Sequence, residues 1–208
     1  SRIVAEVEGV DLTPELISRA KENSKIMGLE VKFIEGDAEF LPYKEDKFDV
    51  ILSQYGHMFA PRPEVVTNEL ARVLKPGGIL AFSTWPKELF MGKFFKLIED
   101  FSPPLPAGVA SPVLWGDMEI IQERLSNQFE RIEFGRDTMY APTMSPAHML
   151  KLFEKNAGPL ANLVTALGDD PTKLKELRNS ALDLIEKFFS NNFLKQDFLM
   201  TRCIKKSS

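Results

Sequence analysis

The feature that most constrains the fold is a regular alternation of strand and helix patterns through residues 7–85. Four short apolar runs are typical of strands: residues 7–10, 31–38, 48–54 and 78–85. Between the first two, Thr13 and Pro14 open a helical pattern that ends at Gly28. Because strand–helix–strand units cross over right-handedly to a parallel neighbour, the pattern predicts an α/β fold with helices on both faces of a mostly parallel sheet.

The second half predicts the other end of this sheet and a helical insertion. Residues 129–141 and 191–206 have the patterns of two further strands, and Ser145 with Pro146 opens helical periodicity between them. A proline-rich run at residues 101–112 is the one break in composition. The chain is long enough for one domain with an elaboration, so we expect residues 1–208 to form a single domain.

Composition narrows the function classes. The formal net charge is −4, and no basic run is longer than Lys205–Lys206, which disfavours nucleic acids and anionic membranes as partners. The single cysteine, Cys203, excludes an internal disulfide framework and a multi-cysteine zinc site. No apolar window reaches the roughly 18–20 residues needed to span a bilayer, and no signal segment is recognisable. A cytoplasmic protein without a bound metal is therefore expected.

Acidic residues stand at the ends of the first two predicted strands. Asp11 follows the first strand, Asp37 follows the second, and residues 53–59 follow the third. The carboxyl ends of parallel strands are where such folds bind ligands. A carboxylate there can accept hydrogen bonds from ribose hydroxyls or from an exocyclic amine. Exposed aspartates in turns are also common, so each residue alone leaves both interpretations open.

Three segments together resemble one family. They are GVDLTPELI (residues 9–17), GDAEFLPYKEDKFDVILSQ (36–54) and ELARVLKPGGILAFSTW (69–85). In order and spacing they resemble class I S-adenosylmethionine-dependent methyltransferases, in particular the small-molecule branch that includes ubiquinone and menaquinone biosynthesis enzymes. The resemblance implies a Rossmann-like doubly wound sheet with an antiparallel terminal strand. It also implies that residues 101–125 and 145–190 are cap segments over the substrate side.

The resemblance assigns S-adenosylmethionine as cofactor and gives individual residues a role in binding it. Asp11 matches the acid that holds the ribose hydroxyls, with Leu12 beside the adenine. Asp37 matches the residue that contacts the adenine amine, and Ala38 offers its backbone N–H. Three residues match the loop under the methionine part and the methyl group: Ser53, Gln54 and Tyr55. Gly77 and Gly78 are interpreted as structural turn residues.

The family's glycine-rich first motif is absent from this sequence. In the family that motif follows a central strand, and the ten residues before Asp11 are too few for a strand, a loop and a helix. A sheet without its central strand would leave two rows of backbone groups unpaired. We therefore expect the natural chain to contain a further strand and loop, with residues 1–6 as the remains of the first helix.

Methyl transfer from a sulfonium needs no covalent intermediate with the protein, so positioning of the acceptor is the main task. The methyl acceptor is expected to be a small apolar or aromatic molecule. His57 is the candidate general base, with a purely structural hydrogen bond as the alternative; His148 is a weaker candidate. Several side chains are candidates for an apolar acceptor pocket: Tyr55, Met58, Phe59, Trp85, Trp115 and Tyr140. The protein is expected to be a monomer or homodimer. A non-catalytic, cofactor-binding or partner-binding relic of the fold remains the alternative, and a nicotinamide dehydrogenase is disfavoured.

Overall fold

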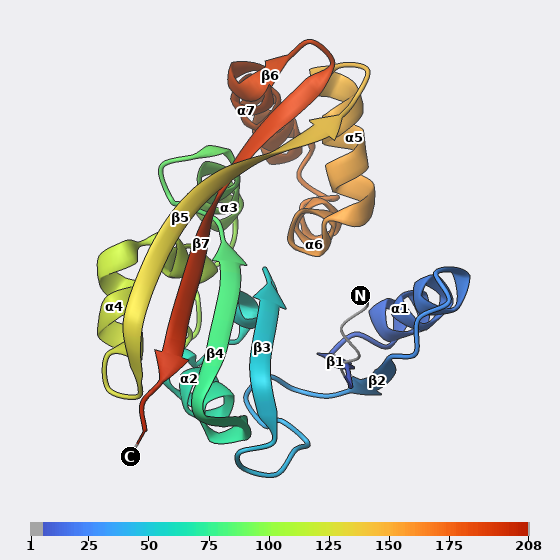
Figure 1. The fold of residues 1–208 in the computed structure, drawn as a ribbon. Coiled ribbons are helices and arrows are strands. Elements are labelled where there is room, and N and C mark those ends of the chain that lie inside the picture. The colour runs from blue at the N-terminus through green and yellow to red at the C-terminus, as the bar shows by residue number, and fades with distance from the viewer. Residues whose placement is uncertain (1–5, 208) are drawn as a thin grey trace.

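The predicted alternation of strands and helices is present in the structure (Figure 1). The structure is a computed structural model and describes residues 6–207. The first half contains β1 (Glu8–Asp11), α1 (Pro14–Ile26), β2 (Lys32–Glu35), β3 (Phe48–Gln54), the 3-10 helix η1 (His57–Phe59), α2 (Pro63–Val73) and β4 (Leu74–Thr84). Each strand overlaps one of the four apolar runs, since these runs are short and bounded by turn residues.

The second half adds helices and a long antiparallel pair of strands. Its elements are α3 (Phe90–Phe101), the 3-10 helix η2 (Pro112–Gly116), α4 (Met118–Leu125), β5 (Phe129–Pro142), α5 (Pro146–Asn156), α6 (Gly158–Ala166), α7 (Pro171–Phe188), β6 (Phe189–Ser190) and β7 (Phe193–Lys205). The predicted insertion between the two long strands thus consists of three helices. Residues at the helix ends explain where two of them begin.

Helix starts follow the capping residues of the sequence. Ser145 Oγ accepts a hydrogen bond of 3.1 Å from the backbone N–H of His148 at the start of α5. Asp170 Oδ1 accepts one of 3.0 Å from Lys173 N at the start of α7. Both helices carry proline at the first turn, where no intrahelical N–H bond is lost. These caps fix the insertion helices to particular residues of the chain.

The strands form two separate sheets. In the smaller sheet β1 and β2 pair in parallel. In the larger sheet β3 and β4 pair in parallel, and β7 lies antiparallel between β4 and β5. The antiparallel end of the sheet agrees with the prediction. No strand within residues 6–207 joins β1 to β3, which is the gap expected for a sheet whose central strand is missing from this sequence.

Two strand edges are consequently open. The edge of β1 away from β2 and the edge of β3 away from β4 make no ladder hydrogen bonds within the described chain. A further strand of the natural chain would fit this arrangement, and it stays a prediction. The predicted helix remnant falls on residues 1–6, of which residues 1–5 lie outside the described part.

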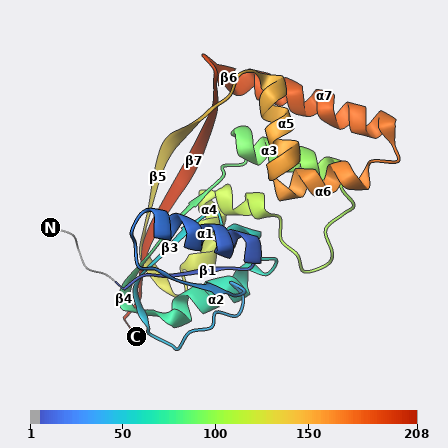
Figure 2. The same ribbon diagram turned by 90° about the vertical axis from the view of Figure 1, so that its right-hand side faces the viewer.

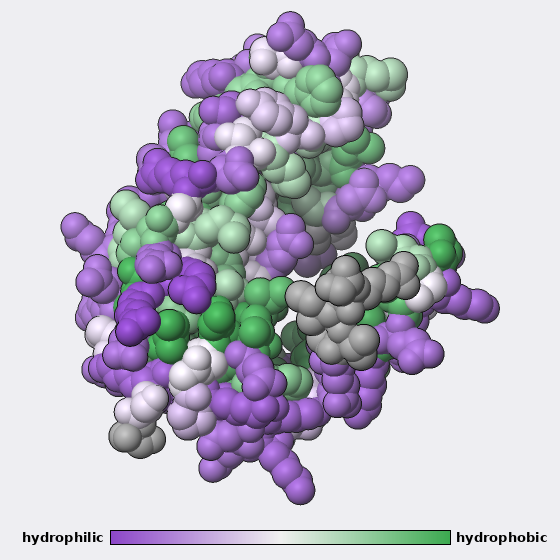
Figure 3. All heavy atoms as spheres, in the orientation of Figure 1, coloured by the Kyte–Doolittle hydropathy of each residue, from purple (hydrophilic) through white to green (hydrophobic). Residues whose placement is uncertain are grey.

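The larger sheet is covered on one face only in this part of the chain. Leu80 and Phe82 of β4 are buried in the main hydrophobic core, on the side that carries α2, α3 and α4 (Figure 2). On the opposite face Leu52 is 77% exposed and is paired with Ala81, and Met200 is also exposed. Figure 3 shows hydrophobic side chains gathered over β3 and β4 on this side. Parallel sheets are normally buried on both faces, so this bare face is unusual.

The antiparallel ribbon of β5 and β7 extends beyond β4 and reaches the insertion helices (Figure 1). In β7 the buried residues change parity along the strand: Leu194 and Gln196 are buried at one end, whereas Leu199, Thr201 and Cys203 are buried at the other. The twist of the ribbon therefore buries opposite faces at its two ends. One end lies in the larger sheet between β4 and β5, and β7 also packs against α3 and α7.

The two segments predicted as caps occupy different places. In residues 101–125, α4 packs against α2 and β5, and η2 packs against η1. In residues 145–190, α5 packs against α6 and α7, and α7 packs against α3. A single domain with both segments over the substrate side stays a prediction. No helix within residues 6–207 is long and apolar enough to cross a bilayer.

Candidate functional site

Asp11 and Asp37 lie at the carboxyl ends of neighbouring strands. Asp11 is paired with Glu35 in the β1–β2 ladder, and Gly36 N donates a 3.0 Å hydrogen bond to the Asp11 backbone oxygen. Asp37 follows directly. The structure therefore brings these two predicted residues to one edge of the smaller sheet, as their strand-end positions require.

One oxygen of each carboxylate is used to fold its own turn. Asp11 Oδ1 accepts a 2.9 Å hydrogen bond from Thr13 N, and Asp37 Oδ1 accepts a 2.8 Å hydrogen bond from Glu39 N. Both are short-range turns that aspartate forms readily. Neither Oδ2 atom has a hydrogen-bond partner in the described chain. Each carboxylate thus keeps one oxygen for an external donor.

Apolar side chains lie beside these carboxylates. Leu12 is 65% exposed although it is apolar, and Ala38 is half-buried. Phe40, which the sequence analysis did not select, is 82% exposed and forms an isolated bridge with Asp37. An exposed aromatic two residues after the GDA segment was the signal available in the sequence. Together these side chains offer apolar surface next to hydrogen-bond acceptors.

Ser53, Gln54 and Tyr55 form the second part of the predicted site, at the carboxyl end of β3. Gln54 is exposed, whereas Ser53 and Tyr55 are half-buried. Tyr55 has a φ of 57°, a left-handed conformation that costs a non-glycine residue free energy. Its N–H donates a 3.2 Å hydrogen bond to Ser83 O, and its ring stacks on Trp85. The strained backbone is thus held by contacts with β4 and the residue after it.

His57 is buried rather than exposed in a loop. Ser53 Oγ accepts a 3.1 Å hydrogen bond from His57 N and lies 2.9 Å from His57 Nδ1. The ring packs edge-on against Phe82 and Trp115, and its Nε2 has no partner within residues 6–207. Burial and, as a smaller cause, the positive charge of Arg124 lower the pKa of His57 to about 3.

This environment weighs against His57 as a general base. A base with a pKa of about 3 has little driving force to take a proton near pH 7. The enclosed ring also has no open face toward a substrate, since its exposure is 4%. The Ser53–His57 contact instead fixes the loop after β3. The structural alternative that the sequence analysis left open is the one that this geometry favours.

The other candidates are distributed between core and surface. Met58 and Trp115 are buried in the main core, and Tyr140 is exposed on β5. His148 Nδ1 lies 2.9 Å from Thr143 Oγ1 and accepts a hydrogen bond from Met144 N. These contacts fix the turn that leads into α5. None of these residues joins the group at the ends of β1, β2 and β3 through a described hydrogen bond.

The two parts of the site are linked by residues that the sequence did not reveal. Glu39, in the turn after β2, binds Arg62, which ends the segment after β3. Because these residues are 23 positions apart and on no common periodic pattern, sequence reasoning had no local signal for the pair. Within the described residues no group of three or more His, Cys, Asp or Glu side chains is arranged to hold a metal ion.

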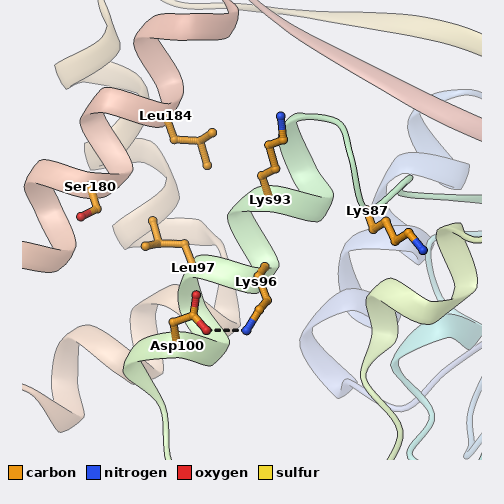
Figure 4. Close-up of a pocket in the computed structure, with 7 residues that line it drawn as sticks. All are labelled: Lys87, Lys93, Lys96, Leu97, Asp100, Ser180 and Leu184. Atoms are coloured by element: carbon orange, nitrogen blue, oxygen red, sulfur yellow. Dashed lines mark hydrogen bonds and ion pairs between the residues drawn. The ribbon is translucent and has the colours of Figure 1, made fainter.

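A hollow of about 310 Å³ lies elsewhere, between α3 and α7 (Figure 4). Its lining consists of Lys87, Lys93, Lys96, Leu97, Asp100, Ser180 and Leu184. Its lysines are already engaged: Lys96 pairs with Asp100, Lys87 pairs with Asp117, and Lys93 lies over the Phe188 ring. None of the strand-end residues lines this hollow, so it is separate from the candidate site.

Comparison with known proteins decides the family. The sequence matches a family described as a methyltransferase domain over residues 1–82. It is 31% identical over 197 residues to an uncharacterized protein of Mycobacterium tuberculosis, covering 94% of this chain and 72% of that protein. The chain belongs to the S-adenosylmethionine-dependent methyltransferases.

Two further comparisons agree with this assignment. The methyltransferase is 38% identical over 89 residues to the demethylmenaquinone methyltransferase of Thermus thermophilus, covering 41% of this chain and 40% of that one. Its fold is similar to that of the YcgJ protein from Bacillus subtilis, with a TM-score of 0.59 and 21% identity, covering 98% of this chain and 83% of the other. The predicted Rossmann-like α/β fold class is confirmed.

The site residues of this methyltransferase fit an adenosyl group. A ribose diol and an adenine amine are hydrogen-bond donors, and the free Oδ2 atoms of Asp11 and Asp37 are acceptors. An adenine ring is flat and apolar on its faces. Leu12 directly follows Asp11 and Phe40 lies three residues after Asp37, and both expose apolar surface. The donor and acceptor types and the apolar surface therefore match the cofactor of the family.

Proposed function

We propose that this methyltransferase transfers a methyl group from S-adenosylmethionine to a small apolar or aromatic acceptor. The observation that carries the proposal is the pair of strand-end carboxylates, Asp11 and Asp37, each with one oxygen free for an external donor. Membership of the family supplies the reaction class. The acceptor and the individual residue roles are part of the proposal.

Each residue of the site has a binding task in this scheme. Asp11 accepts hydrogen bonds from the ribose hydroxyls, and Leu12 packs beside the adenine. Asp37 accepts a hydrogen bond from the adenine amine, while the backbone N–H of Ala38 donates to the ring. Ser53, Gln54 and Tyr55 line the methionine part and the transferred methyl group.

The chemistry requires positioning and exclusion of water. The bound cofactor supplies an electrophilic methyl group on a sulfonium. The protein then has to hold the acceptor's nucleophilic atom in line with the bond that breaks and keep water away. We propose that His57 serves this purpose indirectly as a neutral residue that holds Ser53 Oγ. Helices α5, α6 and α7 are proposed to cover the acceptor.

The choice of a small acceptor is supported by charge. The formal net charge of −4 gives no general attraction to a nucleic acid backbone. We propose a cytoplasmic enzyme that acts as a monomer or homodimer, without contact with nucleic acid or membrane. The absence of a described cluster of metal ligands is compatible with a reaction that uses positioning alone.

Calorimetric titration of the full-length protein with S-adenosylmethionine and S-adenosylhomocysteine tests the proposal. We expect saturable binding of both, followed by transfer of a labelled methyl group to at least one member of a panel of phenols, quinols and small amines. Binding without transfer to any of these, or to RNA and DNA, would favour a non-catalytic relic of the fold. Absence of binding to either compound contradicts the proposed function.

A further inference from the structure

The carboxylate of Glu39 is buried and is bound completely by one arginine. Its Oε1 accepts a 2.6 Å hydrogen bond from the backbone N–H of Arg62. Its Oε2 accepts two hydrogen bonds from the Arg62 guanidinium, 2.8 Å from Nε and 2.6 Å from Nη2. These hydrogen bonds lower the pKa of Glu39 against the opposing effect of desolvation. Two guanidinium N–H groups converge on one carboxylate oxygen and the backbone N–H binds the other, so both orientation and distance are fixed.

This pair joins the two loops that form the candidate site. Glu39 belongs to the turn after β2. In this turn the backbone N–H of Glu39 donates a hydrogen bond to Asp37 Oδ1, and the backbone N–H of Phe40 donates one to the backbone oxygen of Asp37. Arg62 ends the segment that begins at Ser53 and immediately precedes α2. Glu39 raises the pKa of Arg62, and the Asp37 carboxylate lies close enough to add to this effect. The tie therefore acts within two residues of the proposed adenine acceptor.

A second pair anchors the far side of the same loop. Leu41 N donates a 2.8 Å hydrogen bond to Glu69 Oε2, and Arg72 Nη1 donates one of 2.7 Å to Tyr43 O. Glu69 and Arg72 are themselves joined by hydrogen bonds of 2.7 Å on α2. Residues 39–43 are therefore fixed to α2 from both sides, while Asp37 Oδ2 stays free.

We propose that Glu39 and Arg62 are positioning residues that set the affinity for the adenosyl cofactor. This inference rests on the proposed function, because it assumes that Asp37 and Ala38 contact adenine. A loop that is ordered before binding loses less conformational entropy when the ligand arrives, so affinity rises without any new contact. Neither residue needs to touch the cofactor. Once cofactor is bound at saturation the loop is in place, so the rate of methyl transfer does not depend on the pair.

The chain contains a matched control for this pair. Arg178 on α7 donates hydrogen bonds of 2.7 and 3.2 Å to the two carboxylate oxygens of Glu154 on α5. Here too Nε and Nη2 of one arginine bind one glutamate, although they bind its two separate oxygens, and neither residue belongs to the site. Glu39→Gln and Glu154→Gln thus remove the same charge from the same kind of contact. The difference between them reports on position rather than on loss of an ion pair.

The experiment measures calorimetric Kd values for S-adenosylhomocysteine and hydrogen exchange of residues 37–43 in the full-length protein. In Glu39→Gln we expect the Kd to rise about tenfold, which corresponds to about 1.4 kcal/mol, and exchange of these amides to accelerate. Glu154→Gln is expected to stay within about twofold of the parent, the scatter typical of surface substitutions. KM for S-adenosylmethionine should rise in Glu39→Gln while kcat at saturation stays unchanged.

Arg62→Lys keeps the charge but loses the two converging guanidinium hydrogen bonds. This variant covers the case in which Glu39→Gln does not fold. We expect an intermediate Kd in this variant. Parent-like Kd values in both variants, together with weak binding by Asp11→Asn, would overturn the positioning role and leave the proposed function standing. A parent protein that binds neither S-adenosylmethionine nor S-adenosylhomocysteine would overturn both.

Discussion

The ring of Tyr55 lies flat against the ring of Trp85, with centroids 3.9 Å apart and planes 4° from parallel. Tyr55 follows β3 and Trp85 follows β4, so the stack joins the carboxyl ends of two neighbouring strands. Trp85 itself is held closely, since a Cβ on Gly116 would lie 1.9 Å from the Trp85 backbone oxygen. Tyr55 therefore rests on a fixed support at the edge where the methionine part of the cofactor is proposed to bind.

Trp85 should report on cofactor binding through its fluorescence. A ligand that contacts Tyr55 alters the environment of the stacked indole, so S-adenosylhomocysteine is expected to change the emission of the parent protein. Trp85→Phe should abolish this change, whereas Trp115→Phe should keep it, because the Trp115 ring packs against His57 and Phe82 rather than Tyr55. Only two tryptophans are present, which makes the comparison complete. A signal that disappears with Trp115 instead would argue against a ligand at Tyr55.

Asp11→Asn separates the binding role of Asp11 from its structural one. Asparagine Oδ1 can still accept the hydrogen bond from Thr13 N that shapes the turn before α1. It lacks the charge and the second acceptor oxygen that a ribose diol requires. We expect the Kd for S-adenosylhomocysteine to rise at least about tenfold, since a hydrogen bond to a charged group contributes about 1.5–3 kcal/mol, with unchanged helicity by circular dichroism. Asp49→Asn, at an exposed carboxylate of β3, is the control. Equal affinity of Asp11→Asn and Asp49→Asn would remove Asp11 from the site.

The sequence predicted those parts of the fold that depend on local patterns. Residues 48–54 form β3 with the predicted bounds, because a continuous apolar run between turn residues has one plausible state. The adjacency of Asp11 and Asp37 was also predictable, since both follow strands that pair in parallel. Ser145 and Pro146 gave the start of α5 through capping chemistry.

Features that depend on distant pairing were not predictable in this way. The Glu39–Arg62 tie joins residues 23 positions apart, and nothing in either segment specifies the partner. The segment GHMF has the appearance of an exposed loop, yet His57 is buried because η2 and β4 bring Trp115 and Phe82 against it. The gap between the two sheets, by contrast, was expected, since the residues before Asp11 are too few for the central strand and its loop.

The buried His57 should make stability depend on pH on the acidic side of neutrality. Its pKa falls from 6.5 to about 3 in the folded protein, so folding favours the neutral ring. The associated stability is fully present above pH 6.5 and is lost progressively as pH falls toward 3, at up to about 1.4 kcal/mol per pH unit. Urea unfolding at pH 7 and pH 5 should show a smaller loss for His57→Gln than for the parent. Equal losses would mean that His57 takes up a proton in the folded state.

Cys203 should resist alkylation in the folded protein. Its side chain is fully buried, with Sγ 3.7 Å from the Leu80 backbone oxygen, and burial raises its pKa to about 12. Because the thiolate is the reacting species, labelling by iodoacetamide at pH 8 should be at least about 1,000-fold slower than in urea. Labelling is followed by intact mass, with the urea-unfolded protein as the reference. Fast labelling of the folded protein would show that β7 opens readily at this position.

Gly77→Ala should lower stability without changing cofactor affinity. Gly77 has a φ of 74° in the segment between the Phe48–Leu74 and Val50–Ile79 pairs, where β4 bulges away from β3. No atom lies within 4 Å of a Cβ built at Gly77, so the cost comes from the left-handed backbone and is about 1 kcal/mol. Urea midpoints measure this cost.

The control is Gly158→Ala at the start of α6, where space is also open and φ is not positive. Alanine there reduces the entropy of the unfolded chain and should stabilise by up to about 1 kcal/mol. A Gly77→Ala variant as stable as the parent would mean that the bulge adopts another backbone conformation, and the structural role assigned to this glycine would be wrong.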